Sequence, residues 1–120
     1  MTAIDDFTRL KHIADACQEA LDFIKGITRQ ELENDRMLSL ALVKELEIIG
    51  EATNHISSEL KNRHPDVSWQ DMIGMRNRLV HVYFGINYDI VWQTITENLP
   101  ILLAQINDIL KLDFPQNKSP

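Results

Sequence analysis

Apolar side chains recur at intervals of three and four residues along most of this 120-residue chain. Between Ile4 and Ile24 these positions are Leu10, Ile13, Ala14, Cys17, Leu21 and Ile24. Because an α-helix completes a turn in about 3.6 residues, this spacing gathers the apolar side chains on one helical face. No segment shows the strict apolar and polar alternation that indicates a half-buried strand. The sequence therefore predicts an all-α fold.

Interruptions of the pattern divide the chain into four predicted helices. Gly26 stands where the first helix should end, and Thr28 and Glu31 have the spacing of a capping box, in which a hydroxyl and a carboxylate satisfy free backbone N–H groups. Pro65 disfavours helix at the residue before it, and Gly85 and Asn87 form a break and a cap. The predicted helices cover about 4–24, 30–60, 69–81 and 88–112.

Two residues inside these helices carry further expectations. Gly50 weakens a helix by about 1 kcal/mol relative to alanine, and a common reason to keep such a glycine is the close approach of another backbone. Pro100 removes one hydrogen bond and should kink the last helix. We expect a four- to five-helix up-down bundle over residues 1–112, followed by a flexible tail over 113–120.

The composition limits where the chain works and what it binds. A single cysteine, Cys17, cannot form an internal disulfide, which fits a reducing cytoplasm, and no apolar run approaches the roughly 20 residues of a membrane span. The net charge of −6 argues against sequence-blind binding to nucleic acid over a broad surface. Basic residues nevertheless gather in the middle third of the chain: Arg63, His64, Arg76, Arg78 and His81.

The segment 74–83, GMRNRLVHVY, carries polar residues inside a run that otherwise has the pattern of a buried helix. On a helical wheel Arg76 falls within the apolar arc, whereas Asn77 and His81, four residues apart, fall on the polar side. A buried arginine needs a partner, and one interpretation is a structural ion pair with Glu47 or Glu51.

Each residue of this segment also has an ordinary structural interpretation when taken alone. His81 suits a helix end, Tyr83 suits the rim of a core, and Asn77 and Arg78 suit a solvated helix surface. The three other histidines lack the spacing of a metal site, so we expect no metal ligand set. Cys17 lies on the apolar face of the first helix and is expected in the core.

Together, these residues resemble a known family. RNRLVHVY matches the Arg-x4-His-x-Tyr pattern of the HEPN superfamily, specifically the HepT-like ribonuclease toxins of HepT/MntA-type toxin–antitoxin systems, in which the antitoxin is a minimal nucleotidyltransferase. The flanking segments are similar to that family in the same order: EIIGEA, HPDVSWQDMIGMRN and YFGINYDIVWQTITENLPILL.

The resemblance implies a bundle that forms a homodimer through the motif helices, with two copies of Arg76 and His81 in one cleft. It implies RNA as the substrate and a metal-independent endonuclease of a type VII-like system. His81 would exchange a proton and Arg76 would bind a phosphate, with Asn77 and Arg78 in supporting or phosphate-binding roles.

The same resemblance implies that Tyr83 accepts AMP from the partner nucleotidyltransferase, which would use ATP and Mg²⁺. Anionic groups added beside Arg76 and His81 would repel RNA. The alternative, from another class of protein, is a noncatalytic helical subunit that binds a nucleotide or docks the transferase, and the acidic net charge favours it.

Overall fold

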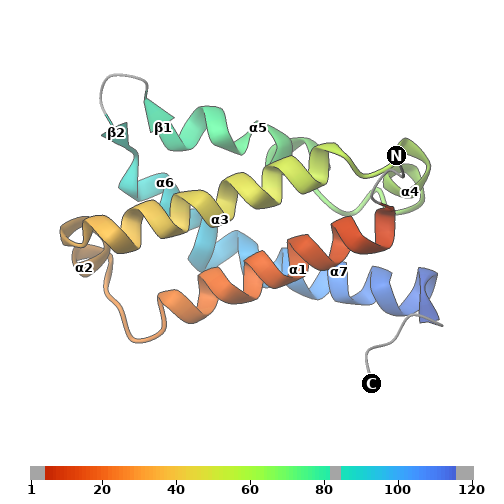
Figure 1. Cartoon of the computed structure of the whole chain (residues 1–120), viewed down its shortest axis with the longest axis horizontal. Coiled ribbons are helices and arrows are strands. Elements are labelled where there is room, and N and C mark those ends of the chain that lie inside the picture. The colour runs from red at the N-terminus through yellow and green to blue at the C-terminus, as the bar shows by residue number, and fades with distance from the viewer. Residues whose placement is uncertain (1–4, 82–84, 116–120) are drawn as a thin grey trace.

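The computed structural model describes residues 5–81 and 85–115, with no side-chain description for 76, 80 and 81. In these residues the chain forms four antiparallel rods around one core, which confirms the all-α prediction (Figure 1). Its elements are α1 (Asp6–Phe23), α2 (Arg29–Asn34), α3 (Arg36–Asn54), α4 (Ser58–Arg63), α5 (Trp69–Leu79), β1 (Val80–His81), β2 (Gly85–Ile86), α6 (Tyr88–Gln93), the π-helical segment η1 (Thr94–Asn98) and α7 (Leu99–Asp113).

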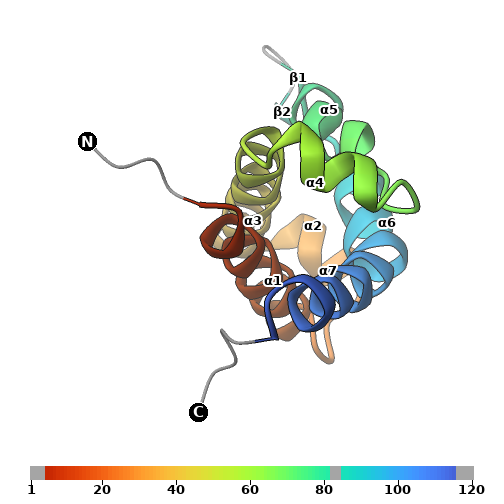
Figure 2. The same cartoon turned by 90° about the vertical axis from the view of Figure 1, so that its right-hand side faces the viewer.

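The rods are α1, α3, α5 and the continuous series α6–η1–α7. Viewed along the bundle they form a ring, in which α3 lies between α1 and α5, and α7 lies beside α1 (Figure 2). The short helices α2 and α4 lie at opposite ends of the bundle (Figure 1). The motif helix α5 therefore packs on α3 along one flank and faces α6 along the other.

Side chains that are almost fully buried fill the space between the rods. Each rod contributes apolar residues at helical spacing, as its sequence pattern predicts. They include Leu10, Ile13, Cys17, Leu42, Leu46, Ile49, Met72, Met75, Leu79, Val91, Ile95, Leu99 and Ile106.

The predicted caps are present. Gly26 ends the first rod with a φ of +75°, a conformation that glycine adopts at little cost. Thr28 Oγ1 accepts the N–H of Glu31 at 3.1 Å, and the Glu31 carboxylate accepts the N–H of Thr28 at 3.0 Å. Asn87 Oδ1 accepts the N–H of Ile90 at 3.2 Å and begins α6.

The prediction of one continuous helix over 30–60 is wrong. Asp35 leaves the helical conformation, with φ −112° and ψ 97°, and its carboxylate caps α3 by accepting the N–H of Leu38 at 3.0 Å. Ser57 caps α4 and is itself held by Asp6 of α1, which accepts the N–H and the hydroxyl of Ser57 at 3.0 and 2.6 Å. Short polar side chains that bond the backbone favour helix ends over helix interiors.

The last rod contains a widened turn where Pro100 was expected to disturb it. Pro100 has no N–H to donate and its ring clashes with a carbonyl in the preceding turn. The turn before Pro100 is the π-helical segment Thr94–Asn98. At its end the N–H of Leu99 donates a hydrogen bond to the carbonyl of Thr94, five residues earlier. The predicted interruption is therefore an enlarged turn.

The helical domain extends slightly beyond its expected boundary at residue 112. Asp113 ends α7, and its Oδ2 lies 2.9 Å from His64 Nε2 and 3.1 Å from Arg63 Nη2, which ties α4 to α7. Phe114 packs against Phe7, with ring centroids 5.6 Å apart. The part of the expected tail beyond residue 115 lies outside the described residues.

Gly50 lies where α3 crosses α5, as its position in the sequence predicted. A Cβ atom added at Gly50 would lie 2.9 Å from the carbonyl oxygen of Met72. Real Cβ contacts essentially never come this close, so the missing side chain is what allows the two backbones to meet. The crossing fixes α5 against α3 one turn before Arg76.

The Gly50→Ala substitution should lower the free energy of unfolding by about 1–3 kcal/mol, because the added methyl group forces two backbones apart. The matched control is Gly74→Ala in α5, where an added Cβ meets no atom within 4 Å. This substitution should stabilise the helix by about 0.5–1 kcal/mol. Urea unfolding of the two variants measures both effects. Equal stability of Gly50→Ala and the natural chain would contradict the close crossing.

Candidate active site

The motif residues are divided between a helix and a strand. The backbone of Arg76 lies in α5, but α5 ends at Leu79 and the backbone of His81 lies in β1. The prediction that the helix continues to His81 is wrong. The carbonyl of Leu79 accepts the N–H of Asn87 at 2.8 Å, so it has a partner outside the helix, and the β-branched Val80 favours extended structure.

This correction removes the helical stacking that the sequence suggested for Asn77 and His81. Residues four apart face each other only while the helix continues. A strand advances about 3.3 Å per residue instead of 1.5 Å, so the backbone of His81 is displaced beyond the end of α5. The histidine belongs to the hairpin at the end of the motif helix.

The hairpin is held by backbone pairing and by the helix that follows it. His81 pairs with Gly85 and Val80 with Ile86 in an antiparallel register, and Gly85 has a φ of +83°. Behind β2, Asp89 in the first turn of α6 accepts a hydrogen bond from Arg29 Nε at 2.8 Å. That ion pair, which raises the pKa of Arg29, connects α2 to α6, the helix that follows β2.

The two polar residues after Arg76 are exposed. The side chain of Asn77 makes no hydrogen bond to any described residue, and Arg78 donates from Nη2 to the carbonyl of Asp71 at 3.1 Å. The side chains of Arg76 and His81, and all of Tyr83, lie outside the described residues. Their roles therefore remain predictions.

The interpretation of Arg76 as half of a structural ion pair involves two carboxylates of α3. The carboxylate of Glu51 lies 3.0 Å from His55 Nε2, one turn along the same helix. Glu47 also has an interaction within the chain. Because the side chain of Arg76 lies outside the described residues, the structural ion pair stays a prediction.

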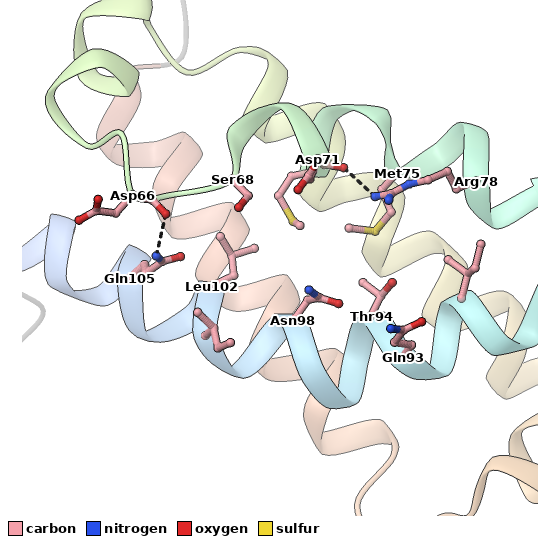
Figure 3. A pocket seen from close by; sticks show the side chains of 13 residues that line it. Asp66, Ser68, Asp71, Met75, Arg78, Gln93, Thr94, Asn98, Leu102 and Gln105 are labelled. Atoms are coloured by element: carbon pink, nitrogen blue, oxygen red, sulfur yellow. Dashed lines mark hydrogen bonds between the residues drawn. The ribbon is translucent and has the colours of Figure 1, made fainter.

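A groove that the sequence analysis did not identify lies on the other flank of α5, between this helix and the α6–η1–α7 rod (Figure 3). It has a volume of about 460 Å³. Arg78 and Asp71 border it from α5, and Gln93 and Asn98 border it from the opposite rod. Only the three-dimensional pairing of these helices brings the residues together, so no local pattern could have signalled it.

The sequence analysis also missed a buried carboxylate. Glu45 of α3 is 4% exposed, and its Oε2 has no hydrogen-bond partner within the described residues. Burial and the nearby carboxylate of Glu19 raise the pKa of Glu45 to about 8. The signal was present, because Glu45 occupies a core position between Leu42 and Ile49 in the helical spacing of α3.

Cys17 is fully buried, as predicted, and burial together with the charge of Glu45 raises the pKa of its thiol to about 12. A thiol with such a pKa is a poor nucleophile near neutral pH. Within residues 5–81 and 85–115, no group of three or more His, Cys, Asp or Glu side chains is arranged to hold a metal ion. In the same residues, every helix is too short or too polar to cross a membrane.

Comparison with known proteins identifies the class to which this bundle belongs. Residues 13–109 match the family described as "Ribonuclease HepT-like". The "Putative RNase" of Caldanaerobacter subterraneus subsp. tengcongensis is 40% identical over 102 residues, which cover 85% of this chain and 91% of that protein. The "Probable ribonuclease HepT" of Thermococcus cleftensis is 33% identical over 102 residues, or 85% and 93% of the two chains. No solved structure matches the chain closely enough to serve as a relative.

The fold and these similarities define an enzyme of the ribonuclease class. The chain belongs to the HepT-like ribonuclease family of the HEPN superfamily. The family match spans both parts of the motif, the helical Arg76 and the hairpin His81.

The pKa of Glu45 leads to a prediction about stability and pH. Since its folded-state pKa, about 8, exceeds the ordinary 4.5, the folded chain retains a proton that the unfolded chain releases between these values. Stability should therefore fall as pH rises through this window, and Glu45→Gln should stabilise the protein more at pH 8 than at pH 5. Urea unfolding at the two pH values measures the difference.

The exposed substitution Glu97→Gln controls for the loss of one negative charge. An equal effect of Glu45→Gln at both pH values would contradict the buried, protonated carboxyl group.

Proposed function

We propose that this protein is a metal-independent RNA endonuclease and the toxin of a type VII-like toxin–antitoxin system in the cytoplasm. The observation that carries the proposal is the family match over residues 13–109, which includes an intact Arg-x4-His-x-Tyr motif at Arg76, His81 and Tyr83. The similar proteins from Caldanaerobacter and Thermococcus carry ribonuclease names, which supports RNA as the substrate.

The proposed catalytic cleft forms between two chains. One copy of the motif supplies one imidazole, whereas cleavage of an RNA phosphodiester requires one proton to leave the attacking hydroxyl and another to reach the leaving oxygen. A symmetric dimer brings two copies of Arg76 and His81 to the same phosphate. It also concentrates positive charge locally in a chain whose net charge is −6.

Exposed apolar side chains on α3 supply a surface for the second chain. Met37 and Leu40 are 83% and 48% exposed and lie three residues apart on one side of α3. The helix that carries them, α3, packs directly on the motif helix α5. Neighbouring exposed apolar side chains are the kind of surface that a second chain can cover.

In the proposed reaction the 2′-hydroxyl of RNA attacks the adjacent phosphorus. One His81 takes the hydroxyl proton as the 2′-oxygen forms its bond to phosphorus, and the bond to the 5′-oxygen breaks as the second His81 donates a proton to it. The products are a 2′,3′-cyclic phosphate and a 5′-hydroxyl end. Arg76 stabilises the negative charge on the phosphoryl oxygens through paired N–H donors.

Control by a partner follows from the position of Tyr83 in the motif. We propose that a minimal nucleotidyltransferase antitoxin, using ATP and Mg²⁺, transfers AMP to the Tyr83 hydroxyl and releases pyrophosphate. The added phosphate places negative charge two residues from His81 and repels the RNA backbone. This modification would silence the nuclease without unfolding it.

Substitution of the motif residues should abolish cleavage. His81→Ala and Arg76→Ala should each lower the rate of RNA cleavage by about 10²–10⁴-fold, because each removes a group that acts in the transition state. Gel analysis of a labelled RNA measures the rate. The controls are His12→Ala and Lys111→Ala, at exposed positions of α1 and α7, which should cleave at the natural rate.

Intact-mass measurement accompanies this assay, because Tyr83 already carrying AMP would mimic an inactive enzyme. Mass increments of whole AMP units that disappear in Tyr83→Phe would support the proposed modification. If the unmodified natural chain leaves RNA as intact as both motif variants do, the nuclease proposal is contradicted. The noncatalytic adaptor is then the favoured function.

The shared cleft requires a dimer. Light scattering should give twice the chain mass of 13.9 kDa. The double substitution Met37→Lys and Leu40→Lys should raise the dissociation constant of the dimer about tenfold or more and lower cleavage in parallel. Leu112→Lys, at a position 73% exposed on α7, is the control and should remain dimeric. A monomeric natural chain that still cleaves RNA would contradict the shared cleft.

A further inference from the structure

The groove between α5 and the α6–η1–α7 rod has the form of a ligand site. Its volume of about 460 Å³ lies within the range typical of small-molecule sites, about 300–1,000 Å³. Its floor is formed by side chains at most 7% exposed, which makes it part of the packed bundle. These floor residues are Met72, Met75, Thr94 and Leu102.

The widened turn aligns two amides along one wall of the groove. In an α-helix, residues five apart point about 140° away from each other, whereas a π-helical turn places them nearly on the same face. Gln93 and Asn98 are five apart across η1, and both line the groove (Figure 3). Neither amide hydrogen-bonds to any described residue, so their donors and acceptors are available to a ligand.

The opposite wall supplies a planar cation and a carboxylate. The guanidinium of Arg78 is held by its hydrogen bond to the Asp71 carbonyl, and the Asp71 side chain lies on the same wall. Planar guanidinium groups stack on aromatic rings, and the thioethers of Met72 and Met75 make favourable contacts with ring edges. The groove is therefore suited to a flat heterocycle.

The charges of the lining residues distinguish a base from a phosphate. Asp66 and Asp71 both line the groove, and Arg78 is the one cation among its lining residues in the described part of the chain. This balance disfavours a phosphate. Carboxylates accept hydrogen bonds from base amino groups, and asparagine and glutamine bind base edges through paired hydrogen bonds.

We infer that this groove binds a base of the RNA substrate, at a nucleotide flanking the cleaved one; the inference rests on the proposed ribonuclease function. Positions 76 and 78 are two residues apart and so lie on nearly opposite flanks of α5. The outer surface of α5 between them carries Gly74, which has open space above it, and the exposed Asn77. The RNA chain can cross the surface at Gly74 and Asn77 from the motif to the groove.

The test uses a fluorescein-labelled, mixed-sequence RNA with 2′-O-methyl groups throughout, which lacks the attacking hydroxyl and remains intact. Fluorescence anisotropy should show that Gln93→Ala/Asn98→Ala weakens binding about five- to thirtyfold, because two base-reading amides are lost. The matched control is Gln18→Ala/Asn107→Ala, at exposed positions of α1 and α7 outside the groove, which should bind like the natural chain. Thermal unfolding should be the same for all three proteins.

A second variant distinguishes the part of the RNA that the groove holds. Asp71→Asn should weaken binding if the carboxylate accepts a base amino group, and should tighten it if the groove holds a phosphate. Tighter binding by Asp71→Asn would overturn the inference. The inference would also be overturned if Gln93→Ala/Asn98→Ala bound the RNA probe as tightly as the natural chain does. That result is also expected if the groove docks a protein instead.

Cleavage of ordinary RNA, measured in parallel, separates this inference from the proposed function. If the natural chain cleaves RNA while the groove double variant binds the methylated probe normally, the groove inference fails and the nuclease stands. If the natural chain binds the probe through the groove but leaves ordinary RNA intact, the nuclease fails and base binding stands.

Discussion

The contact between α3 and α5 at Gly50 determines where the motif helix lies. A side chain there would collide with the carbonyl of Met72, so the absence of a Cβ atom sets the spacing of the two rods. Backbone contact of this kind leaves less freedom than side-chain packing, since side chains can change rotamer and backbones cannot. Arg76 and His81 follow Met72 along the chain, so the crossing fixes the starting point of the helix and hairpin that carry them.

The all-α class and several helix ends follow from the sequence because each has a local cause. Gly26, the box formed by Thr28 and Glu31, and the Asn87 cap act through residues within four positions of themselves. The split at Asp35 was missed because apolar periodicity continues across it, and one carboxylate then decides between a helix interior and a cap.

The candidate site was less predictable, because its geometry depends on partners distant in sequence. α5 ends at Leu79, whose carbonyl bonds Asn87, eight residues later. A wheel drawn through His81 assumes a helix that this contact has replaced with a strand. The family resemblance named motif residues to test, but it did not reveal that the backbones of the arginine and the histidine belong to different secondary structures.

The enlarged turn before Pro100 has a consequence for how this family can vary. The turn at η1 contains one residue more than a turn of α-helix. Such a turn accommodates one inserted residue within the helix. It changes the direction in which nearby side chains point around the helix axis, while Ile95 and Leu99 stay buried in the core. Relatives that gain or lose this residue would keep the same bundle but present different side chains beside α5, so ligand preference could diverge while the motif itself stays unchanged.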